Sequence, residues 1–253
     1  MSGAPSETAG RTGGSCTIII PAHNESAVIA GTIRTIQSAT TGSAREWRLI
    51  VVDDGSTDGT AETAKAALND AGSVIRKDRC EGKAMAIVTG IEACRTERLL
   101  FTDADLSVPV SFFKPFAAAL DDRDVVIASR RLPGSVIERH QPWIRETCGE
   151  IFRRMVRMAF MPDVSDFTCG LKAFRTDVAR ELFRDLLCRD WTFDVEVILR
   201  AKRAGRHLHE IPVRWTNRAD SRVRVASAIV RSMGSLIRLK LKYASIAGRR
   251  GSA

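Results

Sequence analysis

The sequence predicts an α/β protein with a mostly parallel central sheet flanked by helices. Two observations lead to this class. Short apolar runs rich in β-branched residues alternate with segments of helical periodicity over residues 16–129, and such alternation is typical of βαβ units. The apolar runs are also nearly continuous, as expected for strands that are covered on both faces. We therefore expect a buried sheet whose strands are connected by helices.

The elements follow from this alternation in chain order. Strands are predicted at residues 16–20, 48–52, 73–76, 98–102 and 124–129, with helices at about 26–38, 58–69, 83–94 and 112–120 between them. After Ser129 the alternation weakens, and Pro133–Gly134 and Gln141–Pro142 indicate a loop. Further helices are predicted at 145–161, 176–187 and 192–204, and a late strand at 209–215.

The last strong element is an amphipathic, basic helix from about Val223 to Tyr243. One side of its helical wheel carries apolar residues and the opposite side carries basic ones. The apolar set is Val225, Ile229, Met233, Leu236, Ile237 and Tyr243, and the basic set is Arg224, Arg231, Arg238 and Lys242. From Arg200 onward there are 14 Lys and Arg against 2 Asp and Glu, within a net charge of +9. A local anionic partner is therefore expected.

Four segments are predicted in the domain organisation: a tail over residues 1–15, one domain over 16–220, the basic helix over 221–247 and a second tail over 248–253. The first tail lacks the apolar core of a signal peptide. No run of 18 residues is free of charge, so no transmembrane helix is predicted. The six cysteines are scattered without a CxxC pair, which argues against a zinc site or a disulfide framework and favours a reducing, cytoplasmic location.

Polar clusters follow four of the predicted strands. They are Pro21–Glu25, Asp53–Asp58, Glu81–Lys83 and Asp103–Asp105. In open parallel sheets, ligands bind beyond the carboxyl ends of the strands. We therefore expect all four clusters at one edge of the sheet.

Asp103 and Asp105 follow the apolar run Leu99–Thr102. Two carboxylates separated by one residue can share a hard cation that also holds a diphosphate. The alternative is a simple turn, but the position at a strand end favours a metal site.

Three more residues of this edge have two interpretations each. Asp53 either accepts hydrogen bonds from a nucleotide or belongs to a turn in which Asp58 caps the next helix. Glu25 either contacts the same nucleotide or favours the N-terminus of the next helix. Lys83 either meets a phosphate or is an exposed lysine.

Taken together, these motifs resemble the family 2 glycosyltransferases of the GT-A (Rossmann-like) fold, and most of all the dolichyl-phosphate and polyprenyl-phosphate sugar synthases. The resemblance spans roughly Thr17 to Val225. The motifs that carry it are Ile20–Glu25, Val52–Ser56, Gly82–Lys83, Thr102–Ser107, Ala128–Arg130, Gln141–Arg145, Asp166–Lys172, Trp191–Glu196 and Glu210–Trp215.

The resemblance implies an inverting, metal-dependent hexosyltransferase. UDP-glucose is the favoured donor, with GDP-mannose and UDP-GlcNAc as the other candidates, and the acceptor is a polyprenyl or dolichyl phosphate. Asp103 and Asp105 would hold Mg²⁺ or Mn²⁺. The nucleotide-sugar pocket would be lined by Pro21, Asn24, Glu25, Asp53, Lys83, Asp103 and Ala104.

By the same resemblance, the acceptor phosphate is already ionised and needs no strong general base. Catalysis would then consist mostly of positioning and charge neutralisation. The catalytic candidates are Asp105 together with Arg130 and Arg145, whose guanidinium groups suit a phosphate. The acceptor and sugar pocket would contain Asp166, Lys172, Trp191 and Asp194. A salt-bridged loop is the alternative for Asp166 and Lys172, and a place in the core is the alternative for Trp191.

Two basic segments, Glu146–Met161 and Val223–Tyr243, could lie on an anionic membrane and make the protein peripheral on its inner face. The alternative is that both helices simply pack on the core. A family 2 glycosyltransferase with a soluble acceptor also stays open. A non-catalytic sugar-nucleotide-binding module is disfavoured by the intact Asp103 and Asp105. Nucleic-acid binding is not expected, because there is 1 Tyr and no recognised RNA-binding motif.

Overall fold

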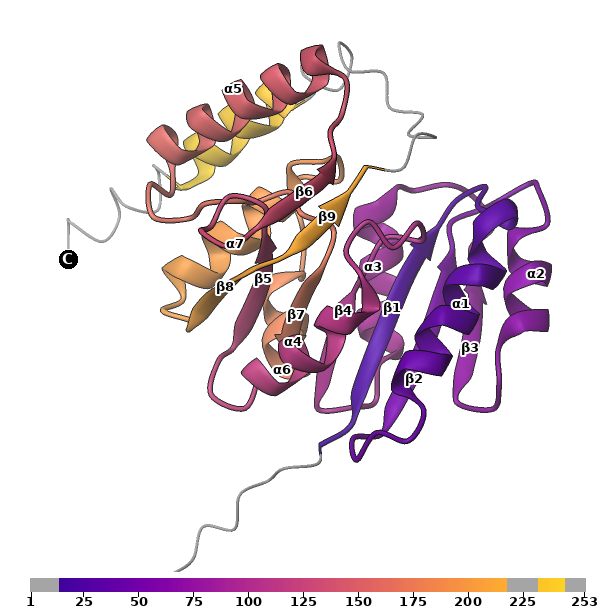
Figure 1. The fold of residues 1–253 in the computed structure, drawn as a ribbon. Coiled ribbons are helices and arrows are strands. Elements are labelled where there is room, and N and C mark those ends of the chain that lie inside the picture. The colour runs from indigo at the N-terminus through magenta and orange to yellow at the C-terminus, as the bar shows by residue number, and fades with distance from the viewer. Residues whose placement is uncertain (1–13, 218–231, 244–253) are drawn as a thin grey trace, which may run out of the picture.

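The computed structural model of the protein describes residues 14–217 and 232–243. Its centre is a seven-stranded sheet with the order β3-β2-β1-β4-β7-β5-β8 (Figure 1). The strands are β1 (Cys16–Ala22), β2 (Trp47–Asp53), β3 (Gly72–Arg76), β4 (Arg98–Phe101), β5 (Val125–Ser129), β7 (Lys172–Arg175) and β8 (Leu208–Pro212). Only β7 runs antiparallel to its neighbours β4 and β5 within this sheet. The predicted mostly parallel α/β fold is confirmed.

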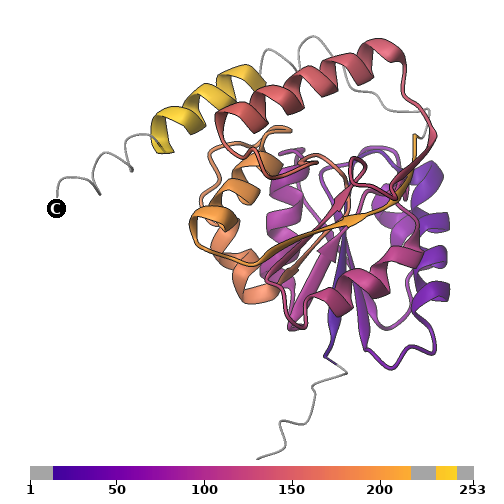
Figure 2. The ribbon, with the colours of Figure 1, turned by 60° about the vertical axis from the view of Figure 1, so that its left-hand side comes forward.

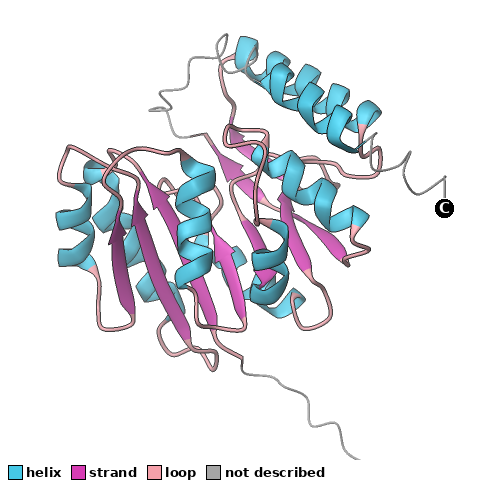
Figure 3. Ribbon diagram, turned by 180° about the vertical axis from the view of Figure 1, so that it is seen from behind, coloured by secondary structure: helices cyan, strands magenta, loops and turns pink. Residues whose placement is uncertain are grey.

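Helices cover both faces of the sheet. They are α1 (Ser26–Thr40), α2 (Thr60–Ala67), α3 (Lys83–Ala93), α4 (Phe113–Ala119, after the short 3-10 turn Val110–Phe112), α6 (Thr176–Leu182) and α7 (Phe193–Arg203). Helix α5 (Trp143–Ala159) lies outside the sheet layer (Figure 1). Successive strand residues point to opposite faces. Ile18 and Ile20 thus share a core cluster with residues of α1, α2 and α4, and Ile19 shares one with residues of α3, α6 and α7. Figure 3 shows helices on both faces of the sheet.

The structure corrects the prediction in the second half of the chain. Two strands were missed: β7, and β6 (Val136–Arg139), which lies where only a loop was expected. The single strand expected over 209–215 is two strands, because the chain leaves β8 after Pro212 and continues as β9 (Arg214–Thr216), which pairs with β6 in a separate two-stranded sheet. The helix predicted over 176–187 ends at Leu182.

Residues 232–243 form a helix that lies beside α5 (Figures 1 and 2). Leu236 and Leu239 are buried and share a core cluster with Val156 of α5. The apolar residues predicted to share one side of this helix therefore have two different environments. Leu236 is buried, whereas Met233 and Ile237 are exposed. The predictions for residues 1–13, 218–231 and 244–253 concern parts of the chain that lie outside the described residues. Over the described ranges, every helix is too short or too polar to cross a bilayer.

Candidate active site

The loops after β1 and β2 interlock at the carboxyl edge of the sheet. Asp54 N–H donates to the carbonyl of Ala22 at 2.8 Å. Asn24 adopts a left-handed φ of 56°, and its side-chain oxygen accepts from Thr57 N–H at 2.9 Å while its own N–H donates to Ser56 Oγ at 2.9 Å. These hydrogen bonds hold the two loops together. The predicted contact between Asn24 and the nucleotide stays a prediction.

Asp53 ends β2 and is completely buried. Its Oδ1 accepts from Ser56 N–H at 3.1 Å. Its Oδ2 has no hydrogen-bond donor among the described residues, and the nearest cation is Arg76, whose Nε is 3.7 Å away. A buried carboxylate oxygen without a donor is costly, so Asp53 is suited to accept a hydrogen bond from a ligand.

Asp54 is a structural residue of the site that the sequence reasoning passed over in favour of Asp53. Its carboxylate accepts from the N–H groups of Glu81 at 3.1 Å and Gly82 at 2.7 Å. Burial alone would raise the pKa of Asp54, but these donors bring it below its ordinary value. Asp54 thereby holds the loop that leads into α3 and Lys83. The second aspartate directly after Asp53 at the strand end is the sequence feature from which Asp54 could have been found.

The Asp58 cap prediction is consistent with the geometry. Its two carboxylate oxygens accept from the first N–H of α1, that of Ser26, and from the first N–H of α2, that of Thr60, both at 3.1 Å. One carboxylate therefore ties two helix N-termini together. A hydrogen bond from the Thr60 hydroxyl, together with these backbone donors, outweighs the effect of burial and lowers the pKa of Asp58 to about 2.

Lys83 forms an ion pair with Asp103, which follows β4. Burial would raise the pKa of Asp103, but the Lys83 charge holds it below its usual range. A Cβ on Gly170 would overlap the Asp103 carboxylate, so the chain entering β7 passes directly against it. Lys83 is thus positioned at the carboxylates rather than left as a freely exposed lysine.

Asp105 lies in the turn that follows β4. Its carboxylate accepts from the N–H of Ser107 at 2.9 Å and from Ser107 Oγ at 2.8 Å. In the described part of the chain, no group of three or more His, Cys, Asp and Glu side chains could hold a metal ion. Two carboxylates are chemically suited to a hard cation that takes its other ligands from substrate phosphates and water, which is how Mg²⁺ is commonly bound, and the assignment of Asp103 and Asp105 to a metal stays a prediction.

Lys172 and Asp194 form a buried ion pair beneath this edge. Lys172 Nζ lies 2.8 Å from Asp194 Oδ1 and donates to the carbonyl of Cys169 at 2.7 Å. Burial raises the pKa of Asp194 even though Lys172 and Lys83 oppose it. Because β7 is antiparallel, its first residue lies at the carboxyl edge of its parallel neighbours. The structure therefore places Lys172 and Asp194 at this edge as a buried pair, and their predicted place in the acceptor and sugar pocket stays a prediction.

Trp191 lies in the loop before α7 and is 47% exposed, so it is not a core residue. Phe193, two residues later, is buried and packs on Phe183. The exposed indole of Trp191 is consistent with a pocket or surface role and leaves its predicted sugar contact as a prediction.

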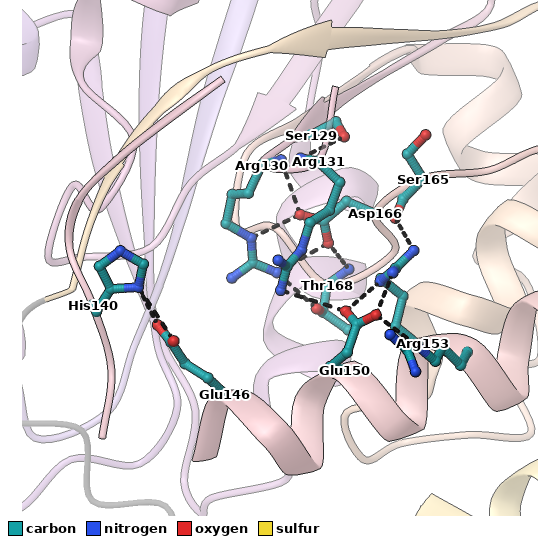
Figure 4. A network of polar contacts seen from close by, with 11 residues as sticks. Ser129, Arg130, Arg131, His140, Glu146, Glu150, Arg153, Ser165, Asp166 and Thr168 are labelled. Carbon is teal, nitrogen blue, oxygen red and sulfur yellow. Dashed lines mark hydrogen bonds and ion pairs between the residues drawn. The ribbon is translucent and has the colours of Figure 1, made fainter. Parts of the chain in front are cut away.

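Arg130 follows β5 and is held by Asp166 (Figure 4). Its Nε and one terminal nitrogen donate to the two carboxylate oxygens at 2.7 and 2.9 Å, and the guanidinium lies 5.3 Å from the Trp215 ring. Burial would lower the pKa of Arg130, but Asp166 raises it above its ordinary value. The salt-bridged loop, the alternative considered for Asp166, is therefore what the structure shows.

Arg145 lies in the first turn of α5. It is half-buried and makes no side-chain hydrogen bond or ion pair with any described residue. It shares a helix face with Phe152 and Val156, seven and eleven residues later, and these pack on the core. Burial lowers the pKa of Arg145. An uncompensated, inward-facing guanidinium is suited to an anionic ligand.

Glu150 of α5 joins several arginines into one network, which the sequence reasoning missed (Figure 4). It accepts from Arg153 at 2.6 and 2.9 Å and from Arg154 at 2.8 Å, and it lies 3.8 Å from Arg131. The hydrogen bonds from Arg153 lower the pKa of Glu150 to about 2. Glu150 thus connects α5 to the loop that carries Arg130.

Residues 17–183 match the model of the family described as glycosyl transferase family 2. Similar curated proteins include glycosyltransferase AglD of Haloferax volcanii, 31% identical over 87% of this chain, and the dolichyl-phosphate beta-glucosyltransferases ALG5C of Trichomonas vaginalis, 28% identical over 84%, and of Dictyostelium discoideum, 25% identical over 90%. The chain spans 36%, 67% and 74% of the lengths of these three relatives.

Solved structures share the fold. Glucosyl-3-phosphoglycerate synthase from Mycobacterium tuberculosis, in complex with UDP, matches with a TM-score of 0.68 at 20% identity over 92% of this chain and 82% of that one. Mannosyl-3-phosphoglycerate synthase from Rubrobacter xylanophilus matches with a TM-score of 0.64 at 15% identity over 92% and 75%. The fold, the edge of carboxylates and the family match agree. The chain belongs to glycosyltransferase family 2 and is a sugar-transferring enzyme of the GT-A fold.

Proposed function

We propose that the protein transfers a hexose, with glucose favoured, from a nucleotide-sugar to a polyprenyl phosphate at a membrane surface. One observation carries this proposal. The carboxylates that follow β2 and β4 share an edge of the sheet with Arg130 after β5. A donor diphosphate with its cation and an anionic acceptor can therefore meet at that edge. The names of the dolichyl-phosphate relatives support this acceptor class.

The donor half of the site is assigned to the residues after β1, β2 and β4. Asp53 offers its free Oδ2 to the base or ribose of UDP-glucose, and GDP-mannose and UDP-GlcNAc remain candidate donors. Asp103 and Asp105 would hold Mg²⁺ or Mn²⁺, which when bound neutralises the charge that grows on the leaving nucleotide. A mycobacterial neighbour in complex with Mn²⁺ and UDP supports this use. Pro21, Glu25 and Ala104 complete the proposed pocket.

The acceptor half is assigned to Arg130 and Arg145. A phosphate oxygen that is already ionised attacks the anomeric carbon from the face opposite the nucleotide, so the C–O bond to the diphosphate breaks and the configuration inverts. Arg145 has a guanidinium without a described partner, and Arg130 is oriented by Asp166. Charge-assisted hydrogen bonds from both would hold the phosphate in line. Within the described residues, we assign 16–217 to the catalytic domain and 232–243 to the attached helix.

A second candidate is transfer to the hydroxyl group of a soluble acceptor, and Asp194 favours it. A hydroxyl nucleophile needs a general base. The carboxylate of Asp194 is buried at the site with a raised pKa, which suits a base. Its ion pair with Lys172, however, leaves it less free to take a proton. The lipid phosphate therefore remains the favoured acceptor.

A donor and acceptor screen tests both candidates. The purified chain, with Mn²⁺ or Mg²⁺, is incubated with UDP-glucose, GDP-mannose or UDP-GlcNAc, with and without a short polyprenyl phosphate. The proposal expects a lipid-linked sugar that forms from one donor and requires both the metal and the lipid phosphate. Donor hydrolysis without lipid product would favour the soluble acceptor. No binding of any nucleotide-sugar would contradict both candidates.

A further inference from the structure

Helix α5 has an apolar stripe on the side that faces away from the core. Four of its large apolar side chains are exposed: Trp143 by 75%, Ile144 by 55%, Ile151 by 53% and Met158 by 81%. Residues 144, 151 and 158 recur every seven positions, which places them on one face of the helix. Val156, on the opposite face, is fully buried. The stripe is therefore not needed to fasten α5 to the domain.

The helix over residues 232–243 repeats this arrangement. Met233, Ile237 and Leu241 recur every four positions and are 37%, 57% and 67% exposed. Its opposite face buries Leu236 and Leu239 in the core. The helix is thus anchored by one apolar face and leaves a second one uncovered.

The two stripes lie on neighbouring helices and hold most of the exposed large apolar residues. Figures 1 and 2 show the two helices side by side outside the sheet layer. Of the eleven large apolar side chains exposed in the described part of the chain, seven belong to these two helices. Scattered exposed apolar residues are normal, but a concentration of them marks an interaction site.

The charges beside the stripes indicate the kind of partner. Arg154, between Ile151 and Met158, has a side chain that is 71% exposed, and Arg238 and Lys240 are exposed on the second helix. The two acidic residues of α5, Glu146 and Glu150, are only half-exposed and are paired with His140 and with arginines. The second helix has no acidic residue over 232–243. An apolar stripe with basic flanks matches the interface of an anionic bilayer.

We propose that the helices α5 and 232–243 form a docking face on which this protein lies on an anionic lipid bilayer. The purpose of docking rests on the proposed function, because an acceptor phosphate on a lipid is reached only at the bilayer surface. The two faces of α5 then have separate tasks. The stripe contacts the bilayer, and Arg145 on the other face is turned toward the catalytic domain. Docking through α5 would therefore bring Arg130 and Arg145, which are assigned to the acceptor, close to the phosphate group of the lipid.

The test is binding to vesicles without any substrate. The full chain is sedimented with vesicles of phosphatidylcholine alone and of phosphatidylcholine mixed with phosphatidylglycerol. The wild type is expected to bind the mixed vesicles more tightly. The variant Met158→Ser/Ile237→Ser, with one change on each helix, is expected to bind them about tenfold or more weakly. The matched control Val28→Ser/Val136→Ser changes two apolar residues that are 38% and 49% exposed on other elements, and it is expected to bind like the wild type.

Three results would overturn the docking face. They are no vesicle binding by the wild type, equal binding by the stripe variant, and loss of a dimer in that variant without a change in vesicle binding, which would make the face a contact between two copies of the chain. Sugar transfer to a short, water-soluble isoprenyl phosphate should survive in the stripe variant. If the stripe-dependent binding is present but no lipid phosphate is ever glycosylated, the proposed function fails while the docking face stands.

Discussion

The two sides of the site are built in different ways. On the side of β1, β2 and β4, backbone groups hold the carboxylates: Ser56 N–H binds Asp53, and the N–H groups of Glu81 and Gly82 bind Asp54. On the side of β5, β7 and α5, side-chain ion pairs such as Arg130–Asp166 hold the structure together. The first side is organised mainly by backbone donors in the loops after parallel strands, with the Lys83–Asp103 ion pair as an exception, and the second side mainly by ion pairs between side chains.

The largest expected difference between the two sides is in how much free energy of unfolding is lost when one charged residue is replaced. Lys172→Met leaves Asp194 as a buried charge without its partner, and the loss of one member of a buried pair costs about 3–5 kcal/mol of unfolding free energy. Asp53→Asn on the first side keeps the shape and the acceptor oxygen, and is expected to cost less than about 1 kcal/mol. Urea unfolding followed by circular dichroism measures both.

The double variant Lys172→Met/Asp194→Leu is the control for this difference. Since it removes both charges, it is expected to recover most of the stability that Lys172→Met loses. If Asp53→Asn and Lys172→Met destabilise equally, the two sides do not differ in the way proposed. Equal losses in the single and double variants would show that the ion pair is not the cause.

The sequence predicted the first side of the molecule far better than the second. The strand-end rule placed Asp53 and Asp103 at one edge because each comes just after an apolar strand, and it placed Lys83 there because Lys83 begins α3 after the loop from β3. The rule fails for β7 because this strand runs antiparallel to β4 and β5 and begins with Lys172, a residue that a pattern search does not treat as buried. Its partner Asp194 is 22 positions away along the chain, and no local pattern indicates that the two will meet.

The ion-pair network around Glu150 was not predicted, because it too joins residues that are distant in the sequence. Arg153 and Arg154 lie within one helical turn of Glu150 and could be paired with it from sequence. Arg131 belongs to the loop after β5, and only the packing of α5 over that loop brings it close. The strands β6 and β9 likewise pair across 78 positions of sequence, as the Ile137–Trp215 register shows.

The next effect is on catalysis and belongs to the first side. Asp105→Ala removes one of the two carboxylates assigned to the cation, and is expected to lower kcat about a hundredfold or more. Initial rates over a Mn²⁺ titration measure it. Asp122→Ala, which removes an exposed carboxylate far from the edge, is the matched control. Full, metal-dependent activity in the Asp105→Ala variant would rule out the assignment of Asp105 as a metal ligand.

A smaller effect tests where the two sides touch. A Cβ on Gly170 would overlap the carboxylate of Asp103, so Gly170→Ala is expected to push Asp103 aside and slow transfer about tenfold. Gly149→Ala in α5 meets nothing within 4 Å and is expected to stabilise the fold by about 0.5–1 kcal/mol. Rates and melting temperatures of both variants are compared. Unchanged activity in Gly170→Ala would mean that the two sides are not coupled through this contact.

The smallest effect concerns acid stability on the second side. The pKa of Glu150 is lowered to about 2 in the folded protein, whereas an unperturbed glutamate titrates near pH 4.3. A carboxylate with a lowered folded pKa adds stability that is fully present above its unfolded pKa and is lost as the pH falls through the folded one. Because its partners are partly exposed, we expect a contribution of about 1 kcal/mol or less.

Glu150→Gln should therefore unfold more easily than the wild type at neutral pH, and the difference should shrink as the pH falls from about 5 toward 2, where the wild-type carboxylate also becomes protonated. Urea unfolding at several pH values measures the difference. Glu46→Gln removes an exposed pair with Arg48 on the first side and is expected to change stability little at any pH. A difference for Glu150→Gln that is the same at every pH would show that its charge does not hold α5, and that the second side depends on apolar packing instead.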